Sequence, residues 1–140
     1  MTRQQRWAKE AFDCVSARKQ DKEPEDYRSL CLKMPALLKQ SGLAQALAFV
    51  RARSGDTGKA FCNDLARVYG VGSVDKKTPG EVLQEEAQQA ALAAYLVLSR
   101  DLIDISVWFR RFAQSELTKK SGQDEPPPPA SLPKVPDARA

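Results

Sequence analysis

Basic side chains of the kind that bind phosphate groups gather in the middle of the chain. Residues 28–67 hold seven Lys or Arg residues against two acidic ones, Asp56 and Asp64. Ammonium and guanidinium groups attract any polyanion regardless of its sequence, so this excess predicts a polyanionic partner. A solvated surface of mixed charge is the alternative interpretation. The candidate contacts are Arg28, Lys33, Lys39, Arg51, Arg53, Lys59 and Arg67, followed by Arg18 and Lys19.

Residues suited to catalysis are scarce. The 140-residue chain has no histidine, which removes the most common general acid and base and the usual zinc ligand. The three cysteines, Cys14, Cys31 and Cys62, contain no CxxC pair and are interpreted as reduced, partly buried thiols. Asp101 and Asp104 are interpreted as part of a solvated helix face. We therefore expect no enzyme, no metal site, no cofactor and no small-molecule substrate.

Three further residues are candidates for contacts with a partner. Phe49 falls about 110° from the centre of the apolar stripe of its predicted helix, at about 100° per residue. An aromatic ring outside the core face needs a neighbour, either in this chain or in another protein. Arg110 and Arg111 follow Trp108 near the C-terminal end of a predicted helix and are expected to face outward, where the helix dipole favours positive charge. That structural role is sufficient, and the functional alternative is a contact with a phosphate or a protein partner.

The elements that position these residues are all predicted to be helices. Apolar residues recur at intervals of three and four, and no stretch alternates as a strand does. The fold class is therefore all-α, a compact bundle of five to seven helices. The predicted helices cover about 2–19, 24–34, 35–41, 43–53, 57–69 and 79–120, the last with a break near residues 86–87.

Several residues mark where these helices begin and end. Pro35 is expected to stop or kink one helix and to begin the next, and Gly42 is expected to take the left-handed conformation that ends it. Thr57 is a predicted N-cap. Thr78 and Glu81 have the spacing of a capping box.

A long C-terminal helix is predicted to be the spine of the bundle. Its apolar residues keep a heptad-like spacing, and we interpret this seam as core within the chain, with a self-associating coiled coil as the alternative. The seam residues are Ala91, Tyr95, Leu98, Leu102, Ile105, Phe109 and Phe112.

The last part of the sequence differs in composition. Residues 1–120 are predicted to form one helical domain, and residues 121–140, with four consecutive prolines, a disordered Pro-rich tail that is dispensable for folding. The chain has no run of 18 apolar residues and no signal peptide, so we expect a cytoplasmic protein with no membrane partner.

Two segments of the chain resemble a known family. The run from Tyr27 through MPALLKQSGLAQALAF, and the segment WFRRFA that begins at Trp108, are similar to the small subunit of the type III-B CRISPR effector (Cmr) complex. The resemblance covers about residues 7–118 and implies an all-α, non-catalytic subunit of an antiviral ribonucleoprotein. It also implies as partners the other subunits of the complex, copies of the chain itself in a filament, and guide and target RNA.

In that function the basic residues named above would face RNA. A second hypothesis is a helical protein-interaction adaptor that binds no nucleic acid and uses Phe49, the seam and the Pro-rich tail. The two hypotheses differ in salt dependence, since phosphate contacts weaken steeply with salt and apolar helix packing does not.

Overall fold

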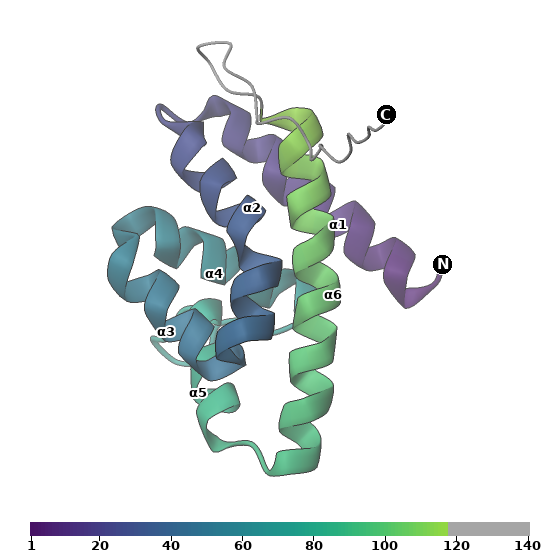
Figure 1. Cartoon of the computed structure of the whole chain (residues 1–140), viewed down its shortest axis with the longest axis vertical. Coiled ribbons are helices and arrows are strands. Elements are labelled where there is room, and N and C mark those ends of the chain that lie inside the picture. The colour runs from purple at the N-terminus through teal and green to yellow at the C-terminus, as the bar shows by residue number, and fades with distance from the viewer. Residues whose placement is uncertain (118–140) are drawn as a thin grey trace, which may run out of the picture.

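The computed structural model describes residues 1–117, and these residues form a helical bundle with no strand, as the sequence predicts. The only β-type pairing among them is an isolated bridge between Val74 and Lys77. The described residues form six α-helices. Figure 1 shows the others packed around the long last one. The helices are α1 (Arg3–Ala17), α2 (Pro24–Ser41), α3 (Leu43–Arg53), α4 (Gly55–Tyr69), α5 (Pro79–Gln89) and α6 (Leu92–Glu116), with the 3-10 turn η1 (Arg18–Gln20) after α1.

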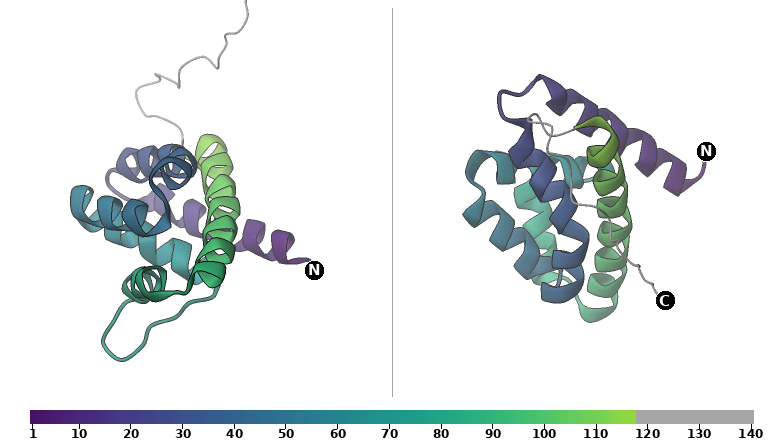
Figure 2. Two further views of the ribbon diagram at one scale, coloured as in Figure 1. Left: turned by 60° about the horizontal axis from the view of Figure 1, so that its bottom comes forward. Right: turned by 45° about the horizontal axis from the view of Figure 1, so that its top comes forward.

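Helix α6 is the spine of the bundle. It makes its most extensive contacts with α2 and α1, and Figures 1 and 2 show α2 alongside it and α1 crossing its C-terminal half. The central seam residues are buried, so this part of the seam is core within the chain. Tyr95 and Phe112 are only partly buried, and Ala91 is exposed because the break after α5 falls at residues 90–91 instead of 86–87.

The core contains a run of aromatic rings packed edge to face. The ring centroids of Tyr27 and Phe61 are 5.5 Å apart, and those of Phe61 and Phe109 are 5.7 Å apart. These three side chains come from α2, α4 and α6, and all are almost fully buried. Such pairs add to the free energy gained from burial itself and fix how the three helices meet.

Helix α2 does not end at Pro35, so the prediction of two helices there was wrong. Pro35 lies inside α2 and is buried. Its ring removes one helical hydrogen bond, but packing of α2 against α6 continues past it and keeps the chain helical. Gly42 ends the helix with φ of +87°, as expected for glycine, although its ψ of 160° is extended and not left-handed helical.

The other helix starts agree only in part with the sequence. Helix α4 begins at Gly55, and Thr57 lies in its first turn instead of capping it. The capping box of α5 is confirmed: the Glu81 amide donates to the Thr78 hydroxyl over 3.3 Å, and the Thr78 amide donates to Glu81 over 2.9 Å. The Gly80 amide donates to the side chain of Asn63 over 2.8 Å, which ties the start of α5 to α4.

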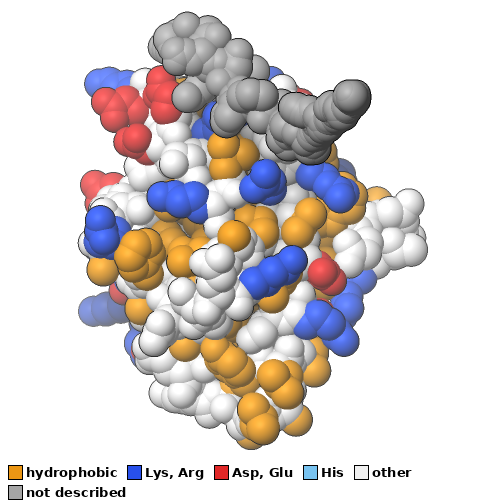
Figure 3. All heavy atoms as spheres, viewed as in Figure 1, with side chains coloured by type: hydrophobic (Ala, Val, Ile, Leu, Met, Phe, Trp, Pro, Cys, Tyr) orange, Lys and Arg blue, Asp and Glu red, His pale blue; other side chains and the backbone are white. Residues whose placement is uncertain are grey.

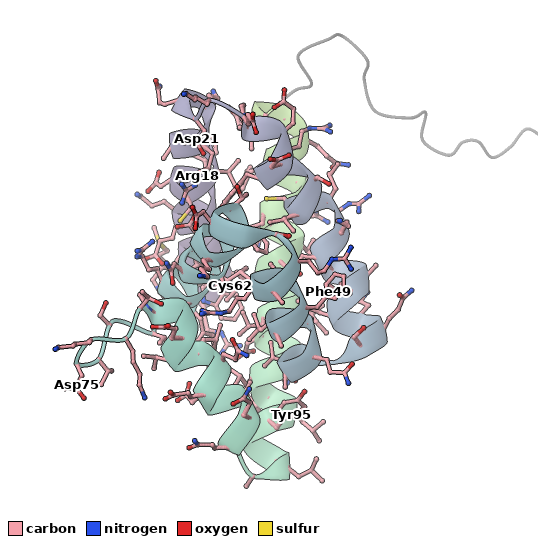
Figure 4. The ribbon with its side chains drawn as sticks, turned by 90° about the vertical axis from the view of Figure 1, so that its left-hand side faces the viewer. Arg18, Asp21, Phe49, Cys62, Asp75 and Tyr95 are labelled. Carbon is pink, nitrogen blue, oxygen red and sulfur yellow. The ribbon has the colours of Figure 1, made fainter. Side chains whose placement is uncertain are left out.

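A loop over residues 71–78 projects from the bundle between α4 and α5 (Figure 2). Asp75 at its tip has φ of +54° (Figure 4). None of the helices in residues 1–117 has the length and apolar character needed to cross a lipid bilayer. The predicted Pro-rich tail, and the domain boundary at residue 120, lie outside the described residues.

Candidate functional site

The cations predicted to contact a polyanion differ in their exposure to solvent, and one of them is buried. Arg28 exposes 6% of its surface, so it does not face solvent as expected. Helical spacing explains this, because Arg28 precedes Cys31 by three residues and Pro35 by seven and therefore lies on the same buried side of α2.

Four other candidates are partly neutralised by carboxylates. Arg18 and Arg67 contact Asp64, Arg51 lies 3.6 Å from Glu81, and Lys19 lies 2.9 Å from Glu116. Their charges are shared with these acids, so they offer less free charge to a partner than their number in the sequence suggests.

The remaining candidates are exposed cations with no carboxylate of residues 1–117 within 4.0 Å. These are Lys33 and Lys39 on α2, Arg53 at the end of α3 and Lys59 on α4. Arg53 instead lies over the ring of Phe49, with 5.2 Å between the guanidinium carbon and the ring centroid. Phe49 is 45% exposed, which confirms that it lies outside the core.

Two of these cations border a hollow between α2 and α3. We call it the Phe49 groove; it has a volume of about 180 Å³, and Figure 4 shows the Phe49 side chain between the two helices. A second hollow of about 340 Å³ adjoins it, shares Leu30, Lys33, Arg53 and Ser54 with it, and adds Asp26, Ser29 and Thr57. The groove itself is lined by Leu30, Lys33, Met34, Leu37, Phe49, Val50, Arg53 and Ser54.

The predicted partner contacts on α6 lie against α2. Arg110 donates from Nη1 to the main-chain oxygen of Leu32 over 2.7 Å, a contact between residues 78 positions apart in sequence. Arg111 lies over the ring of Trp108 at 5.5 Å, and both arginines are exposed. Figure 3 shows Lys and Arg side chains at several separate places on this face of the molecule, with apolar and polar side chains between them and acidic side chains at its upper left.

The sequence interpretation missed a buried carboxylate that joins three helical segments. Asp64 is 3% exposed and accepts hydrogen bonds from Tyr27 Oη (2.6 Å), Arg18 Nη2 (2.8 Å) and Arg67 Nη1 (3.0 Å). Burial alone would lower the pKa of Arg18, but hydrogen bonding to Asp64 and its charge raise the pKa above its ordinary value. Burial, and then the charge of Asp64, raise the pKa of Tyr27. The signal was the position of Asp64 on the buried face of α4, between Phe61 and Leu65.

The interpretation of Asp101 as part of a solvated helix face was also wrong. Asp101 is 3% exposed, whereas Asp104 beside it is half-buried. Its carboxylate lies 3.6 Å from Arg3 on α1 and 3.6 Å from Arg100 on α6. It therefore joins the start of α1 to α6.

The three thiols are packed inside the bundle or at its edge. All three are free, Cys31 and Cys62 are buried and Cys14 is half-buried. Burial raises the pKa of Cys14 and of Cys62 to about 12, which keeps both protonated and poorly nucleophilic near neutral pH. No group of three metal-ligating side chains occurs in the part of the chain that the structure describes.

An apolar patch lies at the start of α6, at the opposite end of the helix from Arg110. Leu92, Leu96 and Val97 are 72%, 58% and 48% exposed, and Figure 3 shows apolar side chains gathered at this end. The hydroxyl of Tyr95 between them accepts a hydrogen bond from the Ala44 amide over 3.1 Å, which fixes this turn against the start of α3 (Figure 4).

Comparison with known proteins gives one consistent result. A family model described as CRISPR-associated protein (Cas_Cmr5) matches residues 3–116. The chain is 40% identical over 114 residues to the CRISPR system Cmr subunit Cmr5 of Thermus thermophilus, covering 81% of this chain and 95% of that protein. The fold is similar to the crystal structure of a Cmr5 family protein from the same organism, with a TM-score of 0.75 and 39% identity. That match covers 84% of this chain and 98% of the crystallised chain.

Proposed function

The chain belongs to the Cmr5 family of CRISPR-associated proteins, and on this premise we propose that it acts as a non-catalytic subunit of a type III-B CRISPR ribonucleoprotein. In this proposal it works in the cytoplasm in antiviral defence, assembles with the other subunits and lines the path of guide and target RNA. The relative from Thermus thermophilus is itself described as a subunit of the Cmr system.

The observation that carries the RNA role is the set of exposed cations without carboxylate partners among residues 1–117. Lys33, Lys39 and Arg53 project from two packed helices, and Arg110 adds a fourth charge, held against the main chain of α2 at Leu32. Rigid helices hold these charges in fixed places, which suits contact with the regularly spaced phosphates of a nucleic acid. Phosphate contacts do not depend on base sequence. A subunit that lines the path of guide RNAs of different sequence needs contacts of this kind.

The apolar patch at the start of α6 supports assembly of copies into a filament. Leu92, Leu96 and Val97 lie at one end of the longest helix, and a contact from one end to a different surface of the next copy adds subunits without closing a ring. Burial of these side chains would supply the apolar part of such an interface.

A charge reversal tests the RNA role. The variant Lys33→Glu, Lys39→Glu, Arg53→Glu should melt like the parent, because all three side chains are exposed. It should lose single-stranded RNA binding, measured by fluorescence anisotropy, or weaken target capture when assembled with its partner subunits. Parent binding should also fall steeply between about 50 and 200 mM salt, as the release of counterions from phosphates requires.

The matched control changes net charge by the same amount elsewhere. Lys9, Lys22 and Lys76 are exposed residues in other elements, and their replacement by Glu should leave RNA capture near the parent value. Equal loss in both triple variants would show that net charge, and not this face, attracts the RNA. Normal RNA capture with failed assembly in the first variant would instead favour the adaptor function, for which exposed Phe49 is the supporting observation.

A further inference from the structure

We propose that the Phe49 groove holds one unpaired nucleotide, with its base against the Phe49 ring and its phosphate between Lys33 and Arg53. This inference rests on the proposed RNA function and deepens it, because it gives one place where the chain contacts a base. Phe49 and both cations line the same hollow, and Arg53 already lies over the Phe49 ring at 5.2 Å.

The chemistry of the lining matches the parts of a nucleotide. An aromatic ring that is 45% exposed offers a flat apolar surface, on which any of the four bases can stack. The exposed ammonium of Lys33 and the guanidinium of Arg53 supply the positive charge that a phosphate needs. The adjoining hollow brings Ser29, Thr57 and Asp26, whose side chains can hydrogen-bond to a ribose hydroxyl or to the edge of a base.

A peptide fits this lining less well. The walls are helices, whose main-chain groups already bond within the helix, so an extended peptide finds no strand edge to pair with. An amphipathic helix needs a long exposed apolar floor, but Leu30, Met34 and Val50 are each 6% exposed or less. The accessible apolar surface is mainly the Phe49 ring with part of Leu37, which is enough for one planar group.

The test replaces Phe49 in the full-length chain and measures binding of a labelled single-stranded RNA by anisotropy. Phe49→Leu keeps an apolar side chain but removes the ring. It should weaken RNA binding by about tenfold, which is the loss of affinity expected when one base no longer stacks on an aromatic ring. Phe49→Trp should keep binding, and its added indole fluorescence should be quenched when RNA is added. Binding of a duplex RNA of the same length should be unchanged by either substitution, since its bases are not free to stack.

Salt dependence separates the stacked base from the phosphate contact. Phe49→Leu should leave the slope of log affinity against log salt unchanged, because no charge is lost. Lys33→Gln with Arg53→Gln should reduce that slope by about 0.7, the value for one neutralised phosphate in a single strand. The matched control is Phe12→Leu, the same change at a ring that is 39% exposed but packed on Phe112 in a different part of the bundle; it should bind RNA like the parent.

Each other result has a definite meaning. Normal RNA binding by Phe49→Leu, combined with loss of binding in the glutamine double variant, overturns the groove proposal and leaves the proposed RNA function standing. Normal binding in both variants, and also in the triple glutamate variant, overturns both proposals. Normal RNA binding by Phe49→Leu with failed assembly of the complex overturns the nucleotide proposal and assigns the groove to a protein partner.

Discussion

Leu47→Asp should unfold the domain or lower its melting temperature severely. Leu47 lies in the middle of the buried face of α3 and is fully buried, with Leu43, Ala46 and Val50 around it on the same face. A carboxylate placed there has no cation of its own, and the cost of burying it is several kcal/mol, against a total stability of about 5 to 15 kcal/mol for a domain. Circular dichroism at 222 nm during thermal melting measures the effect.

The neighbouring residue provides the control. Ala48 is exposed on the same helix, so Ala48→Asp adds the same charge one residue further along without burying it. This variant should melt within a few degrees of the parent. If Leu47→Asp were soluble and melted as Ala48→Asp does, α3 would not pack on the bundle as described.

Asp64→Asn should cause the second large loss of stability. The substitution keeps the size of the side chain but removes the charge that holds Arg18 and Arg67 and the best acceptor for the Tyr27 hydroxyl. Removing one partner from a buried ion pair costs about 3 to 5 kcal/mol. Because the side chains of Arg18 and Arg67 are 25% and 56% exposed, water can compensate in part, and we expect about 2 to 3 kcal/mol. Urea unfolding followed by fluorescence measures this difference.

Two further variants separate the parts of this cluster. Tyr27→Phe removes one hydrogen bond to a buried charged group and should cost about 1.5 kcal/mol, the lower end for such bonds, because Arg18 and Arg67 still bond the Asp64 carboxylate. Asp13→Asn makes the same chemical change as Asp64→Asn at an exposed acid that pairs with Lys9 at 3.1 Å, and it should cost less than about 1 kcal/mol. A loss at Asp64 as small as that at Asp13 would show that the cluster is solvated in solution.

The sequence predicted a structural feature correctly where the residues that determine it are close together in the chain. Thr78 and Glu81 mark the start of α5 because a capping box needs only residues three apart. The positive φ of Gly42 was also expected, because it depends on the residue type at that position alone. The spacing of apolar residues also predicted the buried part of the seam, from Leu98 to Phe109. It did so because a helix with one side covered by other helices buries residues at intervals of three and four.

The errors arise where a distant element decides the outcome. Pro35 was expected to end a helix, and packing of α2 on α6 overrides that local preference. Arg28 was counted among the exposed cations because charge predicts exposure, whereas its place on the buried side of α2 decides its burial. The Phe49 groove could not be predicted either, since spacing placed Phe49 off the core but did not show that Lys33 and Arg53 border the same hollow.

The packing of α1 against α6 has a consequence for how the chain folds during its synthesis. The side chain of Trp108 donates to Gln4 over 2.9 Å, a contact between residues 104 positions apart, and the Arg3 guanidinium lies 3.6 Å from the Asp101 carboxylate. The inner face of α1, with Trp7 and Val15, therefore has no complete partner until α6 has left the ribosome. Until then the apolar face of α1 stays exposed. The core forms only when the two ends of the domain come into contact. We infer that the domain folds late and as a single cooperative unit, so that ribosome-bound chains ending within α6 remain sensitive to protease.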